Sequence, residues 1–204
     1  MIRRSTLSLI LIASVSTVAS TGSLADQITD QIDAGRRSYE AGDARVAIQA
    51  LQFAVAEIEA QLRQRQLLLL PEPLPGWSAD DAVSESGGLA AMIAGTNLSR
   101  SYRNDSTGAG VQISIIADSP LLSMMGMMMS SPMMMQATPG SSPYLHEGYR
   151  GMMEQNQDGT IKVSLMVGSR ILVQIEGDGS ANRETLEAFL TRMDLSNLEK
   201  ALLG

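Results

Sequence analysis

Short segments with strand-like patterns, separated by turn sequences, fill the second half of the chain, and they limit its fold more than any other feature. Thr96–Arg103 alternates in polarity and ends at a turn cluster, residues 104–108. Gly110–Ala117, GVQISIIA, is then expected to pair back as the second strand of a hairpin. Three more segments of this kind are Glu147–Glu154, Thr160–Val167 and Arg170–Glu176. The pattern predicts an antiparallel sheet of about five strands.

Helical patterns accompany the predicted strands. Residues 182–193 show apolar positions at helical spacing, with Ser180 or Asn182 as the N-cap, and a shorter helix is expected over Ser196–Leu203. Together with the sheet they predict an α+β domain over residues 89–204. This order of elements is similar to that of the PsbP/LpqN-like α/β sandwiches. The resemblance implies that fold and an exported protein, and it implies no site residues.

Residues 26–70 predict an antiparallel helical hairpin. Apolar or small residues recur at helical spacing in two stripes, and Gly42-Asp43 between them is typical of a helix end followed by a new N-cap. The stripes are Ile28, Ile32, Gly35 and Tyr39, then Ala47, Leu51, Ala54, Val55, Ile58 and Leu62. Residues 34–43, with Ala47, Ile48, Leu51 and Ala54, resemble one tetratricopeptide repeat. A single repeat cannot form that family's peptide groove, so the stripes are expected to pack on the neighbouring domain or to bind a partner.

Two further segments flank this hairpin. Residues 1–25 combine Arg3 and Arg4, an apolar stretch and the small-residue exit Ser23-Leu24-Ala25, which is typical of a secretory signal peptide. The protein is therefore expected to be periplasmic or secreted, with no membrane span. Residues 71–88 open with the sequence PEPLPGW, which favours an extended crossover held to the body by its apolar residues and Trp77.

The methionine-rich segment is the strongest candidate site. Eight of the fourteen methionines lie between Met124 and Met135. Residues 121–129 predict a helix that starts after Ser119-Pro120 and has almost no polar face. The segment could be buried, could form an adaptable contact surface for a protein, another copy or a lipid, or could bind Cu(I) through its thioethers.

These alternatives define two sets of candidate residues. A partner surface would use Leu121, Leu122, Met124, Met125, Met127, Met128, Met129, Met133, Met134 and Met135. A copper site, the one cofactor considered, would use Met124, Met125, Met127 and Met128, with His146 adding a nitrogen from the far side of a Pro/Gly/Ser loop. The segment resembles the methionine-rich copper motifs of exported copper-handling proteins.

Composition excludes several other functions. The absence of cysteine rules out disulfide scaffolds, thiolate metal centres and cysteine nucleophiles, and a single histidine rules out sites that need two imidazoles. A formal charge of −7, without a basic run, argues against nucleic acid as a partner. No G-x-S-x-G or S-x-x-K motif is present, so a hydrolase with an unidentified site remains only an alternative. The sequence predicts a non-catalytic binding or assembly protein.

Overall fold

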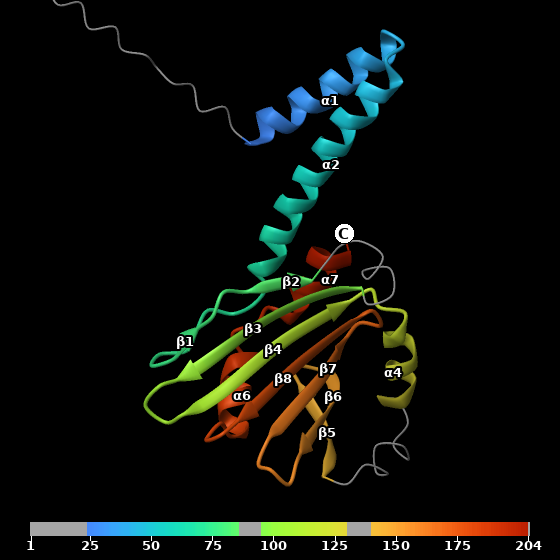
Figure 1. Ribbon diagram of the computed structural model, residues 1–204. Coiled ribbons are helices and arrows are strands. Elements are labelled where there is room, and N and C mark those ends of the chain that lie inside the picture. The colour runs from blue at the N-terminus through green and yellow to red at the C-terminus, as the bar shows by residue number, and fades with distance from the viewer. Residues whose placement is uncertain (1–23, 86–94, 130–139, 204) are drawn as a thin grey trace, which may run out of the picture. The chain divides into compact units, whose positions relative to one another are not determined.

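The protein has an α+β fold, as the sequence predicts. The computed structural model describes residues 24–85, 95–129 and 140–203. An N-terminal helical hairpin is followed by an antiparallel sheet and C-terminal helices (Figure 1). The chain divides into two compact units, Met1–Ile58 and Glu59–Gly204, and the boundary falls within the second helix. Residues 1–23 of the predicted signal segment lie outside the described residues.

The hairpin consists of helix α1 (Leu24–Glu40) and helix α2 (Ala44–Leu67). Gly42 adopts a φ of 87°, a left-handed conformation that glycine adopts without strain, and it ends α1 as predicted. The amide of Ala47 donates to the carbonyl of Asp43, which closes the first turn of α2. The predicted turn at Gly42-Asp43 is therefore confirmed.

Small residues form the contact between the two helices. Gly35, Ala47 and Ala54 are buried, and a Cβ added at Gly35 would lie 2.8 Å from Cγ of Leu51. The larger residues of both stripes are mostly exposed instead: Ile32, Tyr39, Leu51, Val55, Ile58 and Leu62. Only the small residues of the stripes are buried, because helices that approach this closely leave little room between them for larger side chains.

The sheet is antiparallel throughout, in the order β1-β3-β4-β8-β7-β6-β5, with β2 also paired to β3. Its strands are β1 (Ser78–Ala79), β2 (Val83–Glu85), β3 (Thr96–Asn104), β4 (Ala109–Ala117), β5 (Ser141–His146), β6 (Tyr149–Gln155), β7 (Ile161–Val167) and β8 (Ile171–Asp178). The five predicted strands correspond to β3, β4, β6, β7 and β8. Strands β1, β2 and β5 are additional.

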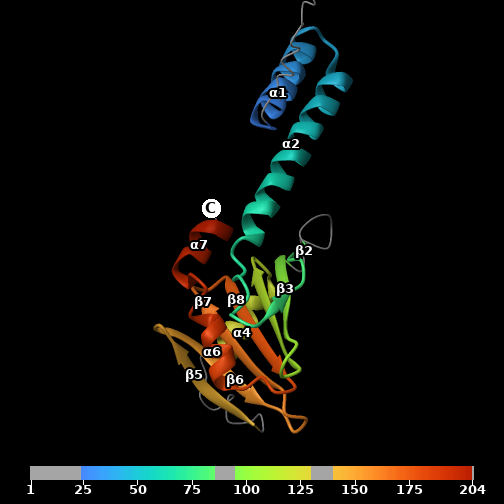
Figure 2. The same cartoon turned by 90° about the vertical axis from the view of Figure 1, so that its left-hand side faces the viewer.

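One face of the sheet carries the main core. Helices α6 (Arg183–Leu190) and α7 (Leu195–Leu203) pack against this face. Figure 2 shows the sheet curving round α6, with β5 on one side of the helix and β3 on the other. Asn182 caps α6 by accepting a hydrogen bond from the amide of Thr185, so the second of the two predicted caps is the one used. Phe189 is fully buried at the centre of this packing.

The crossover from α2 to the sheet is held to this core, as predicted from its apolar residues. Trp77 meets Phe189 in an edge-to-face contact with ring centroids 5.2 Å apart. Leu70 is buried in the same core, and Leu74 packs against it. The proline-rich segment is therefore an ordered part of the second unit and not a loose linker.

Candidate functional site

The helix predicted over residues 121–129 is present as α4 (Leu121–Met129). Ser119 caps it, because its Oγ accepts a hydrogen bond from the amide of Leu121 and its carbonyl accepts one from the amide of Leu122. Pro120 lies between this cap and the helix, where the missing amide hydrogen has no cost. The local sequence signals therefore place the helix correctly.

The described side chains of α4 divide between buried and exposed positions. Leu122 is 3% exposed, while Leu121 and Met124 are 61% and 62% exposed. Gly126 faces the sheet, because a Cβ added there would lie 3.8 Å from Cε of Met166 on β7. Nothing is described for the side chains of Met125 and Met127–Met129, and Met133–Met135 lie outside the described residues. The helix thus turns Leu122 inward and presents apolar side chains to solvent.

His146 lies in strand β5, where the sequence predicts a loop. It follows Tyr144 by two residues, so both side chains project from the same face of the sheet. Tyr144 reaches Glu187 of α6, which identifies this face as the one that α6 covers. Met166, next to the core residue Leu165 in β7, projects from the opposite face, where it meets α4. The structure therefore does not bring His146 together with α4.

Around His146 the structure assembles a polar cluster that sequence reasoning missed. Tyr144 stacks with His146 at a ring-centroid separation of 6.5 Å, and its hydroxyl donates to Oε1 of Glu187 at 3.3 Å. Arg183 Nε donates to the same oxygen at 2.7 Å, and its guanidinium lies over the Tyr144 ring. The cluster joins β5 to α6 across a long stretch of sequence, so no local motif could have revealed it.

Arg183 and Glu187 form an ion pair within this cluster. The hydrogen bond from Arg183 holds the pKa of Glu187 below its usual range. Burial and the Glu187 carboxylate raise the pKa of Tyr144 to about 12. Nε2 of His146 is buried and has no hydrogen-bond partner among the described residues. The cluster links β5 to α6 through the hydrogen bond between Tyr144 and Glu187 and the contact of Arg183 with the Tyr144 ring.

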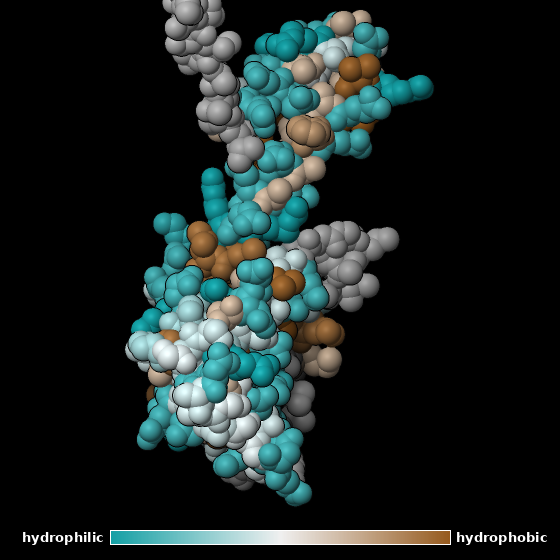
Figure 3. Space-filling model, turned by 60° about the vertical axis from the view of Figure 1, so that its left-hand side comes forward, coloured by the Kyte–Doolittle hydropathy of each residue, from teal (hydrophilic) through white to brown (hydrophobic). Residues whose placement is uncertain are grey.

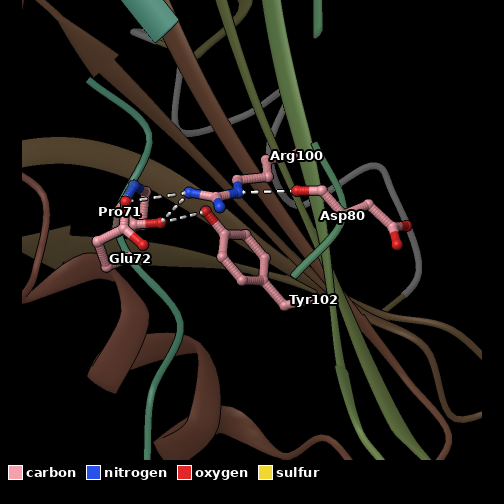
Figure 4. A network of polar contacts seen from close by, with 5 residues as sticks. All are labelled: Pro71, Glu72, Asp80, Arg100 and Tyr102. Atoms are coloured by element: carbon pink, nitrogen blue, oxygen red, sulfur yellow. Dashed lines mark hydrogen bonds and ion pairs between the residues drawn. The ribbon is translucent and has the colours of Figure 1, made fainter. Parts of the chain in front are cut away.

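A second polar network fixes the crossover to strand β3 (Figure 4). Tyr102 donates from its buried hydroxyl to the carbonyl of Pro71 at 2.7 Å. Arg100 donates to the carbonyls of Pro71 and Asp80 at 3.3 and 3.0 Å, and its Nη1 lies 3.5 Å from Oε1 of Glu72. Burial raises the pKa of Tyr102 to about 12, so this hydroxyl stays a donor over the ordinary pH range. These contacts hold the crossover and the connection between β1 and β2 against strand β3.

The described surface also contains a recess of about 280 Å³ at the turn between β3 and β4. Glu176, Asp178 and Arg103 line it together with backbone. Gly110 leaves room for the Asp178 carboxylate, which any Cβ at that position would contact. The recess therefore places two carboxylates and one guanidinium close to the β3–β4 turn.

Within the described residues, no group of three or more histidine and carboxylate side chains is arranged to hold a metal ion. None of the described helices combines the length and the apolar character needed to cross a bilayer.

No protein-family model, no curated protein and no solved structure matches this chain. The assignment of function therefore rests on the sequence and on the surfaces described above.

Proposed function

We propose that this chain is an exported, non-catalytic binding or assembly protein that docks an apolar segment of a partner protein on α4. The observation that carries this proposal is the exposure of Leu121 and Met124 beside the buried Leu122. Leu122 is buried, and Gly126 one turn further along approaches Met166 of the sheet, so the exposed pair lies on a helix whose other side is packed. Methionine adapts to partners of different shape because its side chain is unbranched and polarizable.

The test uses a photo-reactive amino acid placed at residue 121 or 124 and expressed in the source organism. Irradiation is expected to give an adduct with a second polypeptide from both positions. The matched control is residue 145, since Leu145 is also apolar and exposed but belongs to β5. Adducts of equal yield from residue 145, or adducts with lipid alone, would contradict docking of a protein on α4.

The partner identified in this way permits a quantitative measurement. We expect Leu121→Ser combined with Met124→Ser to weaken its binding about tenfold or more, because burying one such side chain contributes about 1.5–3 kcal/mol. The far-UV circular dichroism should not change, since both side chains are exposed. Unchanged affinity would overturn the proposal.

Export is part of the same proposal and has its own test. The basic start, the apolar stretch and Ser23-Leu24-Ala25 support cleavage before Asp26. Mass spectrometry of the protein isolated from the source organism is expected to show Asp26 as the first residue. Recovery of the uncleaved chain from the cytoplasm would contradict export without affecting the docking proposal.

A tetratricopeptide-like hairpin also belongs to the proposal. The burial of Gly35, Ala47 and Ala54 between α1 and α2 supports it, because that repeat places small residues where its paired helices touch. The PsbP/LpqN-like fold is supported only by the order of the strands and helices. Both resemblances concern architecture and assign no ligand.

A further inference from the structure

We propose that the α1–α2 hairpin is half of a four-helix bundle and that a second copy of this chain supplies the other half. The interface is the apolar hairpin face, defined by Ile32, Tyr39, Ile48, Leu51, Val55 and Ile58. This surface is distinct from α4 and assigns the protein a self-association that docking on α4 does not require.

The members of the apolar hairpin face are exposed large side chains. Ile48 and Val55 are 56% and 53% exposed, and the other four are exposed as well. Figure 3 shows apolar atoms among the hydrophilic ones over the hairpin. Isolated exposed apolar residues are common on protein surfaces, but several on two adjacent helices mark a contact site.

Helix geometry places these residues on one side of the hairpin. At about 100° per residue, Ile48, Leu51, Val55 and Ile58 follow the buried Ala47 and Ala54 in one rotational direction round α2. Ile32 and Tyr39 follow Gly35 in the same direction round α1. Because the helices are antiparallel, equal rotations from their shared contact lead to the same side. The proximity of Gly35 to Leu51 agrees with this placement.

The spacing on α2 suits packing against another helix. Ile48, Leu51, Val55 and Ile58 are separated by three, four and three residues, which is the a/d spacing of a coiled-coil seam. Glycine and alanine are the residues buried between the two helices, and the large apolar residues of the hairpin remain mostly exposed. Its large residues can then be covered by a hairpin of the same kind, as in four-helix bundles.

Charge favours a second copy over the other occupants. A two-fold interface brings each surface against itself, so unpaired like charges would repel. Residues 46–56 contain no charged side chain. On the α1 edge, Arg36 is paired with Asp33 at 3.4 Å and with Glu40 at 3.7 Å. The apolar hairpin face therefore carries no charge over residues 46–56 of α2, and on α1 the charge of Arg36 is paired within its own helix. Two copies can meet across this face without strong repulsion between like charges.

The same charges argue against an anionic membrane as the occupant. Residues 24–58 contain six carboxylates and three arginines, without lysine. Helices that bind lipid surfaces carry an excess of Lys and Arg beside their apolar face, because each contributes to binding of anionic lipid. This hairpin has the opposite balance.

The test measures the mass of the purified full chain by sedimentation equilibrium. We expect a dimer, with twice the mass that the same preparation shows for one chain under denaturing conditions. Ile48→Glu combined with Val55→Glu should give a monomer with unchanged far-UV circular dichroism. Val46→Glu combined with Phe53→Glu is the matched control and should remain dimeric, since these residues are equally exposed but lie on the other side of α2. A monomeric wild type, or equal dissociation of both variants, would overturn the proposal.

A second measurement keeps the inference testable if the glutamate variant unfolds. The chain has no cysteine, so a single thiol can be introduced at will. In Val55→Cys the thiol should become less reactive toward maleimide as protein concentration rises, whereas in Gln49→Cys, on the outer side of α2, its reactivity should stay constant. Equal reactivity at all concentrations, or protection only by phosphatidylglycerol vesicles, would overturn self-association. Loss of photo-adducts at α4 would leave it unaffected.

Discussion

At the scale of single residues, Tyr102 holds several parts of the second unit together. The centroid of its ring lies 4.6 Å from the ring centroid of Phe189, and its hydroxyl donates a hydrogen bond to the Pro71 carbonyl. One side chain therefore connects strand β3, helix α6 and the crossover. Because the Pro71 carbonyl is buried, it needs a donor from within the protein.

Tyr102→Phe should lower the free energy of unfolding by about 1 kcal/mol, because it removes this hydrogen bond and keeps the ring contacts. The loss is not expected to be larger, since Arg100 also donates to the Pro71 carbonyl. Urea denaturation followed by Trp77 fluorescence measures it. Tyr39→Phe is the control without expected effect, as Tyr39 is exposed. Equal stability of both variants would contradict a role for the hydroxyl.

The two buried tyrosines predict a loss of stability at high pH. Tyr102 and Tyr144 have a pKa of about 12 in the folded protein, compared with 10.0 for a free side chain. The folded state therefore holds these protons more tightly than the unfolded state. Their contribution is complete below pH 10 and is lost as the pH rises toward 12. Unfolding midpoints measured across this range should fall, and Tyr102→Phe should make the fall less steep. A constant midpoint would contradict this.

At the scale of elements, the sequence predicts those helices and hairpins that depend on residues close together in the chain. The β3–β4 hairpin, α4 with its Ser119 cap and α6 with its Asn182 cap follow from turn residues, caps and periodicity. Strand β5 was missed because Pro143 interrupts it, and proline is tolerated there only because β5 is the last strand of the sheet. Strands β1 and β2 are too short to show a pattern. Both strands pair with β3, and a local sequence pattern does not reveal such a pairing.

The candidate site shows the same limit. The sequence predicts the bounds of α4 but not which of its apolar residues are covered, because the sheet against which it packs, with Met166, is built from distant segments. The hairpin stripes also combine two classes of position, since Gly35 and Ala54 are buried while Val55 is exposed. Periodicity identifies the apolar side of a helix, and only the packing partner decides how much of that side is buried.

Two substitutions in α4 separate its anchoring side from its exposed side. Leu122→Ala should lower the free energy of unfolding by about 2 kcal/mol or more, because it leaves a cavity at a buried position. Met124→Ala should change it by less than about 0.5 kcal/mol, since the side chain is exposed. Urea denaturation measures both. Equal losses would show that α4 is covered on both sides and would remove the basis for docking there.

At the scale of the whole molecule, the two units differ in what stabilises them. The sheet unit has an extensive core of buried aliphatic and aromatic side chains around Phe189. The hairpin unit buries glycine and alanine between its helices and leaves its larger apolar residues exposed. Two helices with so small a core are marginally stable in isolation, because little apolar surface is removed from water. Self-association would add the burial that the hairpin lacks.

This difference predicts two unfolding transitions with different concentration dependence. Trp77 is the only tryptophan and contacts Phe189, so its fluorescence reports on the sheet unit. Circular dichroism at the helical minimum reports mainly on the longer helices α1 and α2. The helical signal should be lost at lower urea than the fluorescence signal, and its midpoint alone should rise with protein concentration, because association stabilises the folded hairpin by mass action. In Ile48→Glu combined with Val55→Glu the helical midpoint should become independent of concentration. If both signals change together at every concentration, the hairpin derives its stability from within the chain, and the four-helix bundle is not needed to explain it.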